Sequence, residues 1–120
     1  MPAYFDDRIE LQAHGALLCV YAGSQQIGHT EQAIRLSERG YEDRFYLPWA
    51  AIVSDCLQRS DKQTHCPYKG DTRYYHVVID GVCHENAGWV YPQPRVEMAA
   101  IAGRIAFDHP QIRLAGAEPA

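Results

Sequence analysis

A hairpin signal in the second half of the chain constrains the fold more than any other sequence feature. Residues 74–79 (YYHVVI) are rich in aromatic and β-branched side chains, which are typical of a strand. The dipeptide Asp80-Gly81 follows directly, and it is a strong signal for a tight turn between two antiparallel strands. Val82 and Cys83 then begin the partner strand. The sequence therefore predicts antiparallel sheet built from local hairpins.

Further short strands are predicted on both sides of this hairpin. Residues 16–21 and 26–28 are expected to pair around a turn that contains glycine. In residues 32–38 the apolar Ile34 and Leu36 alternate with polar residues, which indicates a half-buried strand, although one helical turn is an alternative. The remaining expected strands are 45–47, 53–57, 89–91 and 112–114, with polar loops at 58–64 and 84–88.

One α-helix is expected near the C-terminus. Pro94 suits the first turn of a helix, where its missing N–H is not needed. Met98, Ile101 and Ile105 recur at spacings of three and four, which gives one apolar stripe. We therefore predict a helix over residues 94–106, and a fold class that is mostly β, or α+β.

The chain is expected to form one domain. Its 120 residues are near the usual size of a single domain, and it contains no internal repeat or linker. An apolar fraction of 47% with 22% charged residues is typical of a globular protein. We predict an N-terminal arm at residues 1–13, which could complete a homodimer, a compact domain at 14–115 and a tail at 116–120.

Charge and hydropathy argue against two classes of partner. The net charge is −4, and the eleven Lys and Arg residues form no basic stripe that could neutralise several phosphates, so no nucleic-acid partner is expected. No apolar run approaches the ~20 residues that span a bilayer, and the N-terminus lacks the order of a signal peptide. We expect a cytoplasmic protein with no membrane partner.

The four cysteines are predicted to be free thiols, and no metal or cofactor is expected. Disulfides are rare in a reducing compartment. Closely spaced Cys-x-x-Cys pairs, which mark structural zinc sites, are missing from the sequence. The neighbouring pairs His65-Cys66 and Cys83-His84 would have to supply ligands from two distant strands.

The segment from His65 to Gly70 (HCPYKG) is the first candidate for chemistry. Its thiol stands beside an imidazole and three residues from an ammonium group, and either group would lower a thiol pKa if it lay close. Cys66 and Lys69 are therefore the candidate catalytic residues. The simpler alternative is that Cys66 is a small buried hydrophobe and that His65 faces the other side of the chain. Lys69 is expected to meet a carboxylate or an anionic ligand, and a plain surface lysine is the alternative.

Aromatic residues form the second candidate group. They could line a pocket in which a ring stacks and hydroxyl groups orient a ligand. They could equally be core residues whose polar tips are hydrogen-bonded. The members of this group are Tyr46, Tyr68, Tyr74, Trp89 and Tyr91.

The same residues carry a resemblance to a known family. Residues 37–40 (SERG), 46–48 (YLP), 66–70 (CPYKG) and 89–94 (WVYPQP) are similar to successive signatures of the bacterial family described as domain of unknown function number 427. The similarity covers about residues 14–115. It implies a single domain of strongly bent antiparallel sheets, similar to Mss4-like or β-tent proteins. Some of those bind zinc through cysteine pairs that this chain lacks. The family is also described as nucleotidyltransferase-like.

The resemblance further implies that the signature residues converge on a polar cavity. We predict that a small polar or anionic molecule binds there, and that Glu38 pairs with Lys69. A small enzyme that acts on nucleotides and a structural dimerisation module are the alternatives. The residues expected to surround the ligand are Glu38, Tyr46, Cys66, Lys69, Tyr74, Trp89 and Tyr91.

Overall fold

The computed structural model describes residues 3–5 and 8–117, and strands account for most of them. Between the strands lie short 3-10 helices, η1 (Trp49–Ala51), η2 (Ser54–Cys56) and η3 (Val96–Ile101). The strands are β1 (Ala3–Phe5), β2 (Ile9–His14), β3 (Leu18–Ala22), β4 (Gln25–Thr30), β5 (Ala33–Glu38), β6 (Arg44–Tyr46), β7 (Leu57–Cys66), β8 (Gly70–Ile79), β9 (Val82–Val90), β10 (Ile105–Phe107) and β11 (Ile112–Ala115).

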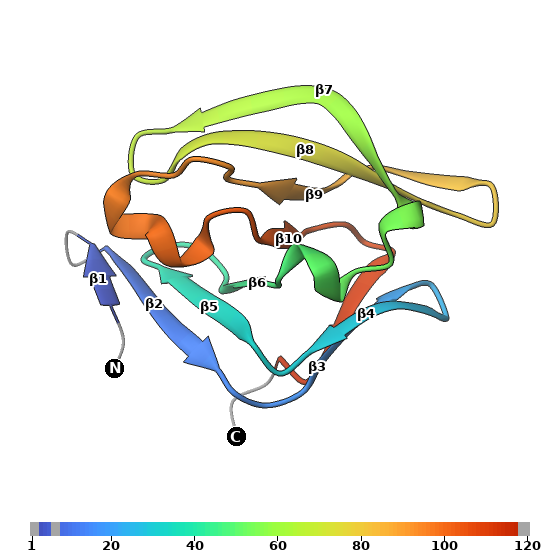
Figure 1. Cartoon of the computed structure of the whole chain (residues 1–120), viewed down its shortest axis with the longest axis horizontal. Helices are drawn as coiled ribbons and strands as arrows, with labels where there is room; N and C mark the ends of the chain where they lie inside the picture. The colour runs from blue at the N-terminus through green and yellow to red at the C-terminus, as the bar shows by residue number, and fades with distance from the viewer. Residues whose placement is uncertain (1–2, 6–7, 118–120) are drawn as a thin grey trace.

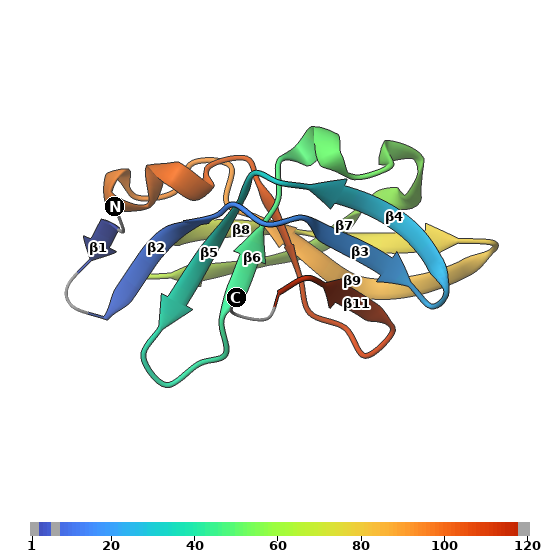
Figure 2. The ribbon, with the colours of Figure 1, turned by 90° about the horizontal axis from the view of Figure 1, so that it is seen from below.

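These strands form three antiparallel sheets. Sheet A has the order β1-β2-β5-β6, sheet B has β11-β3-β4, and sheet C has β10-β9-β8-β7. Sheet C lies across the top of Figure 1, and sheets A and B lie below it as two wings. Seen from below, the wings stand side by side in front of sheet C (Figure 2). The prediction of a single, mostly β domain with antiparallel sheets is confirmed.

Local turn chemistry explains the hairpins. Asp80 and Gly81 both have positive φ, 51° and 77°, as a type I′ turn requires, and they join β8 to β9 as predicted. The predicted pairing of residues 16–21 with 26–28 is also confirmed, because β3 pairs with β4. An isolated bridge between Leu47 and Ile105 then connects the end of sheet A to sheet C.

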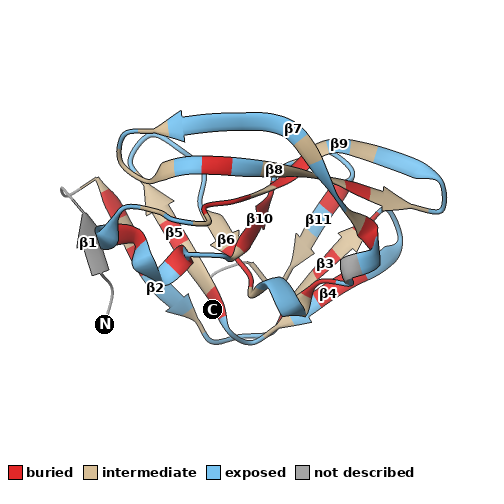
Figure 3. Cartoon of the chain, turned by 45° about the horizontal axis from the view of Figure 1, so that its top comes forward, coloured by how far each residue is buried: buried red, intermediate tan, exposed pale blue. Residues whose placement is uncertain are grey.

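The core consists of two clusters, one under each wing. Between sheets B and C, Leu18, Val20 and Val77 are buried together. Between sheets A and C, Leu36 and Met98 are buried in the second cluster. The buried positions, red in Figure 3, follow the inner faces of the sheets, whereas the outer strand β7 is mostly exposed.

The α-helix predicted over residues 94–106 is not present. The chain instead forms η3, which is irregular at Met98 (φ −105°, ψ 18°), and β10 already belongs to sheet C. Met98, Ile101 and Ile105 are all buried, but they belong to a 3-10 turn and a strand rather than to one helical face. A spacing of three fits a 3-10 turn as well as an α-helix, which explains the error.

Residues 58–64 and 84–88, predicted as loops, are strand. β7 is an edge strand of sheet C, and most of its residues are exposed, so it lacks the apolar alternation that marks a half-buried strand. The predicted strand at 53–57 is mostly the 3-10 turn η2. The polar sequence of the edge strand β7 therefore explains why residues 58–64 were predicted as a loop.

The N-terminal segment, predicted as an arm at residues 1–13, contributes a central strand of sheet A. β2 pairs with β5 from Ile9 opposite Glu38 to His14 opposite Ala33. Ile9 and Leu11 are 1% and 3% exposed. Residues 1–2 and 6–7 of the predicted arm, and residues 118–120 of the predicted tail, lie outside the described residues. No described helix is long and apolar enough to cross a membrane.

Candidate functional site

A cavity of about 460 Å³ lies between sheets A and C. Strands β5 and β6 line one side of it, and β7, β8 and β9 line the other. The seven residues predicted from the sequence to surround a ligand all line this cavity. They are Glu38, Tyr46, Cys66, Lys69, Tyr74, Trp89 and Tyr91.

Strand alternation places these side chains in pairs. Leu36 and Glu38 are two residues apart on β5, so they lie on the same face of sheet A. Across sheet C, Tyr74 on β8 stands directly opposite Trp89 on β9. The antiparallel register therefore brings together residues that are far apart in the sequence.

The tight turn between β7 and β8 positions Lys69. The Lys69 N–H donates to the carbonyl oxygen of Cys66 at 3.2 Å, and the Lys69 carbonyl accepts from the Arg95 N–H at 3.1 Å. Gly70 has φ +112°, and a Cβ at this position would lie 3.3 Å from Cα of Pro94. Glycine is required here because the backbone has a left-handed conformation and a close neighbour.

A largely buried ion pair lines the cavity. Nζ of Lys69 donates to Oε1 of Glu38 at 2.6 Å, and the two side chains are only 11% and 12% exposed. The pair connects the end of β5 in sheet A to the β7–β8 turn in sheet C. The structure therefore brings together the two charges whose pairing the sequence predicts.

Aromatic rings form a wall beside this pair. The Trp89 indole N–H donates to the Tyr46 hydroxyl at 3.1 Å, and the Tyr74 and Trp89 rings lie 6.1 Å apart. Burial raises the pKa of the Tyr46 and Tyr91 phenols well above their usual value. Both hydroxyl groups are therefore neutral at physiological pH. The Tyr46 hydroxyl oxygen accepts from the Trp89 indole, and the hydroxyl hydrogen of Tyr46 can be donated to a ligand.

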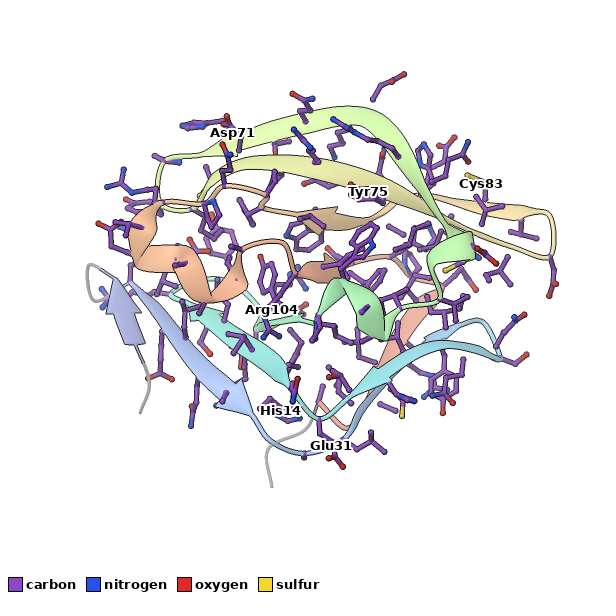
Figure 4. The ribbon with its side chains drawn as sticks, viewed as in Figure 1. His14, Glu31, Asp71, Tyr75, Cys83 and Arg104 are labelled. Atoms are coloured by element: carbon purple, nitrogen blue, oxygen red, sulfur yellow. The ribbon has the colours of Figure 1, made fainter. Side chains whose placement is uncertain are left out.

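Cys66 lines the cavity, whereas its neighbour His65 does not. Nδ1 of His65 lies 2.6 Å from Oδ1 of Asp71, and both side chains are exposed. Asp71, labelled in Figure 4, lies near the end of sheet C where β7 turns into β8. The imidazole and the thiol therefore face opposite sides of β7. Tyr68, also considered from the sequence, lies under the Arg8 guanidinium, 4.6 Å from it, and does not line the cavity.

Sequence reasoning missed the charged rim of the cavity. Arg44 lies 3.2 Å from Asp108 and 3.6 Å from Glu42, and its guanidinium lies 5.8 Å from the Trp89 ring centroid. Arg44 stands two residues before Tyr46 on β6, so strand alternation could have identified it. The other missed lining residues are Leu36, Tyr41, Lys62 and Asn86, of which the last two fall in segments predicted as loops.

The described residues offer no cluster of three or more His, Cys, Asp or Glu side chains that could hold a metal ion. The cysteines Cys19, Cys56, Cys66 and Cys83 are free thiols in the structure. Burial raises the pKa of the Cys56 thiol, which lies in the core away from the cavity. The chemistry of the site therefore rests on ion pairs, phenols, an indole and one thiol.

This fold and site define a small antiparallel β domain with a polar, aromatic cavity between two sheets. Residues 10–116 match the family described as domain of unknown function (DUF427), and the chain belongs to this family. The resemblance found in the sequence is thereby confirmed. No curated protein sequence matches the chain significantly.

Proposed function

We propose that the cavity between sheets A and C binds a small polar or anionic molecule. The observation that carries this proposal is the convergence of seven predicted residues on one cavity of about 460 Å³. Ligand pockets usually have volumes of roughly 300–1,000 Å³, with apolar walls and a few convergent polar groups. The aromatic wall and the buried ion pair fit that description.

The Lys69–Glu38 pair supports a role in recognition. A buried ion pair contributes little net stability compared with well-packed apolar side chains, because both charges lose their hydration. A lysine ammonium has three donors, and a carboxylate accepts at both oxygens. The contact of 2.6 Å uses one donor and one acceptor position, so the remaining ones can contact a ligand.

A cavity-filling variant tests this proposal. Cys66→Phe places a ring in the cavity, whereas Cys19→Phe adds the same bulk on sheet B, outside it. A library of polar metabolites is screened by thermal shift against the wild-type protein and both variants, after circular dichroism has shown that each variant is folded. The proposal expects compounds that raise the Tm of wild type and of Cys19→Phe but not that of Cys66→Phe.

Two results would overturn binding in this cavity. One is a screen in which no compound raises the Tm of the wild-type protein. The other is a set of binders that stabilise Cys66→Phe as strongly as wild type. A folded Tyr74→Ala variant gives a second measurement if Cys66→Phe does not fold, because it enlarges the cavity and should change which compounds bind.

Catalysis by Cys66 is a second candidate function, since its thiol lies in the same cavity as Lys69. A catalytic thiol would have to ionise near neutral pH. Alkylation by iodoacetamide between pH 5 and 9, followed by mass spectrometry, compares Cys66 with the exposed Cys83. A catalytic Cys66 is expected to react faster than Cys83 below pH 7. Slower reaction of Cys66 at every pH would rule this function out.

A further inference from the structure

The strands of sheet C are irregular at one end of the cavity. The register between β7 and β8 shifts between Arg59 and Gln63, which leaves residues 60–62 as a bulge in the edge strand. The register between β8 and β9 also shifts, between Tyr75 and Val77. The facing segment of β9 contains Asn86, whose φ is +51°. Bulges re-aim side chains and are frequent beside functional sites. Here they place Lys62 and Asn86 in the lining of the cavity.

Hydrogen bonds hold this bulge in one conformation. The Lys62 N–H donates to Oγ of Ser60 at 3.1 Å, and the Ser60 hydroxyl donates to Oδ1 of Asn86 at 2.5 Å. The Asn86 N–H in turn donates to Nδ1 of His76 at 2.9 Å. The bulge in β7 is therefore bonded to β9 through Asn86, which is in turn bonded to β8.

The structure places the amide oxygen of Asn86, and not its nitrogen, against the Ser60 hydroxyl. This hydroxyl donates to Oδ1 of Asn86 and accepts from the Lys62 N–H. Nδ2 of Asn86 is then the atom left for other partners. Within the described part of the chain it makes no hydrogen bond, so its two hydrogens are available to a ligand.

Lys62 supplies a positive charge to the same cavity lining. The carboxylates in the cavity lining are already paired, because Glu38 contacts Lys69, and Glu42 and Asp108 contact Arg44. Nζ of Lys62 lies 4.4 Å from the Tyr74 ring centroid. No carboxylate of a described residue lies within ion-pair distance of it. Lys62 is therefore an exposed cation of the cavity lining that has no carboxylate partner among the described residues and that can contact a ligand.

We propose that Nζ of Lys62 and Nδ2 of Asn86 form a subsite for the carboxylate of a small organic acid, whose body lies along Tyr74 and Trp89. This inference rests on the proposed binding function and names the ligand class. The three cations and three carboxylates of the cavity lining sum to no net charge, so a bound monoanion adds less unbalanced negative charge than a dianion. A phosphate monoester carries about 1.5–2 negative charges at neutral pH, and the excess would face the exposed carboxylates of the rim. Charge balance therefore favours a monocarboxylate.

Matched compounds test this subsite on the full chain. The probes are benzoate, phenylacetate and hexanoate, their primary amides, and phenyl phosphate, with dissociation constants measured by NMR titration at fixed ionic strength. The inference expects each acid that binds to do so at least about tenfold more tightly than its amide, because a charge-assisted hydrogen bond is lost in the amide. Phenyl phosphate is expected to bind more weakly than benzoate.

Two variants locate the effect. Lys62→Met should abolish the preference for acids over amides. Arg59→Met, which removes one positive charge from the same strand outside the cavity lining, should keep it. Equal affinity for acids and amides, tighter binding of phenyl phosphate, or an unchanged preference in Lys62→Met would each overturn the subsite. Binding of neutral compounds in those cases would leave the proposed function standing.

Absence of binding by every probe would overturn the monocarboxylate subsite alone. The metabolite screen with the cavity-filling variant judges the proposed function separately. If Lys62→Met does not fold, Ser60→Ala provides a second variant, because it removes the hydroxyl that orients Asn86 and should also weaken the preference for acids.

Discussion

Tyr46 and Tyr91 show how burial sets the protonation of groups in the cavity. Burial is the main cause of the raised pKa of both phenols. A phenol in the unfolded chain has a pKa near 10, so above this pH the unfolded state loses protons that the folded state retains. The free energy of unfolding must then fall as the pH rises above about 10.

We expect Tyr46→Phe to make this alkaline decline less steep, by up to about 1.4 kcal/mol per pH unit, because phenylalanine cannot ionise. Urea unfolding of both proteins at pH 9, 10 and 11 measures the slope. Tyr41→Phe is the control, since it removes the same hydroxyl group from an exposed tyrosine. Identical slopes for wild type and Tyr46→Phe would show that Tyr46 ionises equally in both states.

The Lys69–Glu38 pair leads to a second expectation. Lys69→Met leaves the Glu38 carboxylate, 12% exposed, without its cation, and should lower the free energy of unfolding by about 3 kcal/mol. Adding Glu38→Met to this variant removes the stranded charge and should recover most of the loss. Urea unfolding of the two single variants and the double variant completes the cycle. Additive losses would mean that the two side chains do not interact.

Among the strands, local signals predicted the β3–β4 and β8–β9 hairpins but failed for a strand that lies at an exposed sheet edge. The β8–β9 hairpin was predictable because Asp80-Gly81 encodes its own turn. β7 was not, because an edge strand in solvent needs no apolar alternation. The helix at 94–106 was wrong because apolar residues at spacings of three and four can also be buried by a short turn followed by a strand.

A substitution at Gly70 tests whether the β7–β8 turn requires a left-handed backbone conformation at this position. We expect Gly70→Ala to lower the free energy of unfolding by about 2 kcal/mol, because alanine is strained at φ +112° and its Cβ would lie 3.3 Å from Pro94. Gly15→Ala is the matched control, since its φ is not in the left-handed region and nothing lies within 4 Å of its Cβ position. Equal stability of the two variants would contradict this account of the turn.

Over the whole molecule, the gathering of the site residues follows from the packing of sheet A against sheet C. Residue types and signatures indicated seven lining residues before their positions were known. Lys62 and Asn86 could not be found in this way, because a bulge depends on the register between strands that the sequence does not specify locally. Lys62 and Asn86 are therefore the missed lining residues that irregular strand pairing places in the site.

Deletion of residues 1–13 tests the role of the N-terminal segment. It removes all of β2 except His14, including the buried side chains of Ile9 and Leu11. These two side chains alone account for about 5 kcal/mol, against a total stability of about 5–15 kcal/mol for a typical domain. We expect near-UV circular dichroism to show loss of fixed tertiary structure. A folded protein would contradict this, and light scattering would then show whether the deletion disrupts a homodimer.

The most direct test of the central claim uses the two tryptophans of the chain as internal probes. The Trp89 indole lies in the cavity wall, bonded to Tyr46, whereas Trp49 packs against Tyr75 outside the cavity. Titration of ¹⁵N-labelled protein with the tightest binder from the metabolite screen should shift the Trp89 indole resonance saturably and leave that of Trp49 in place. A bound compound that moves Trp49, or neither indole, would contradict a ligand site between sheets A and C.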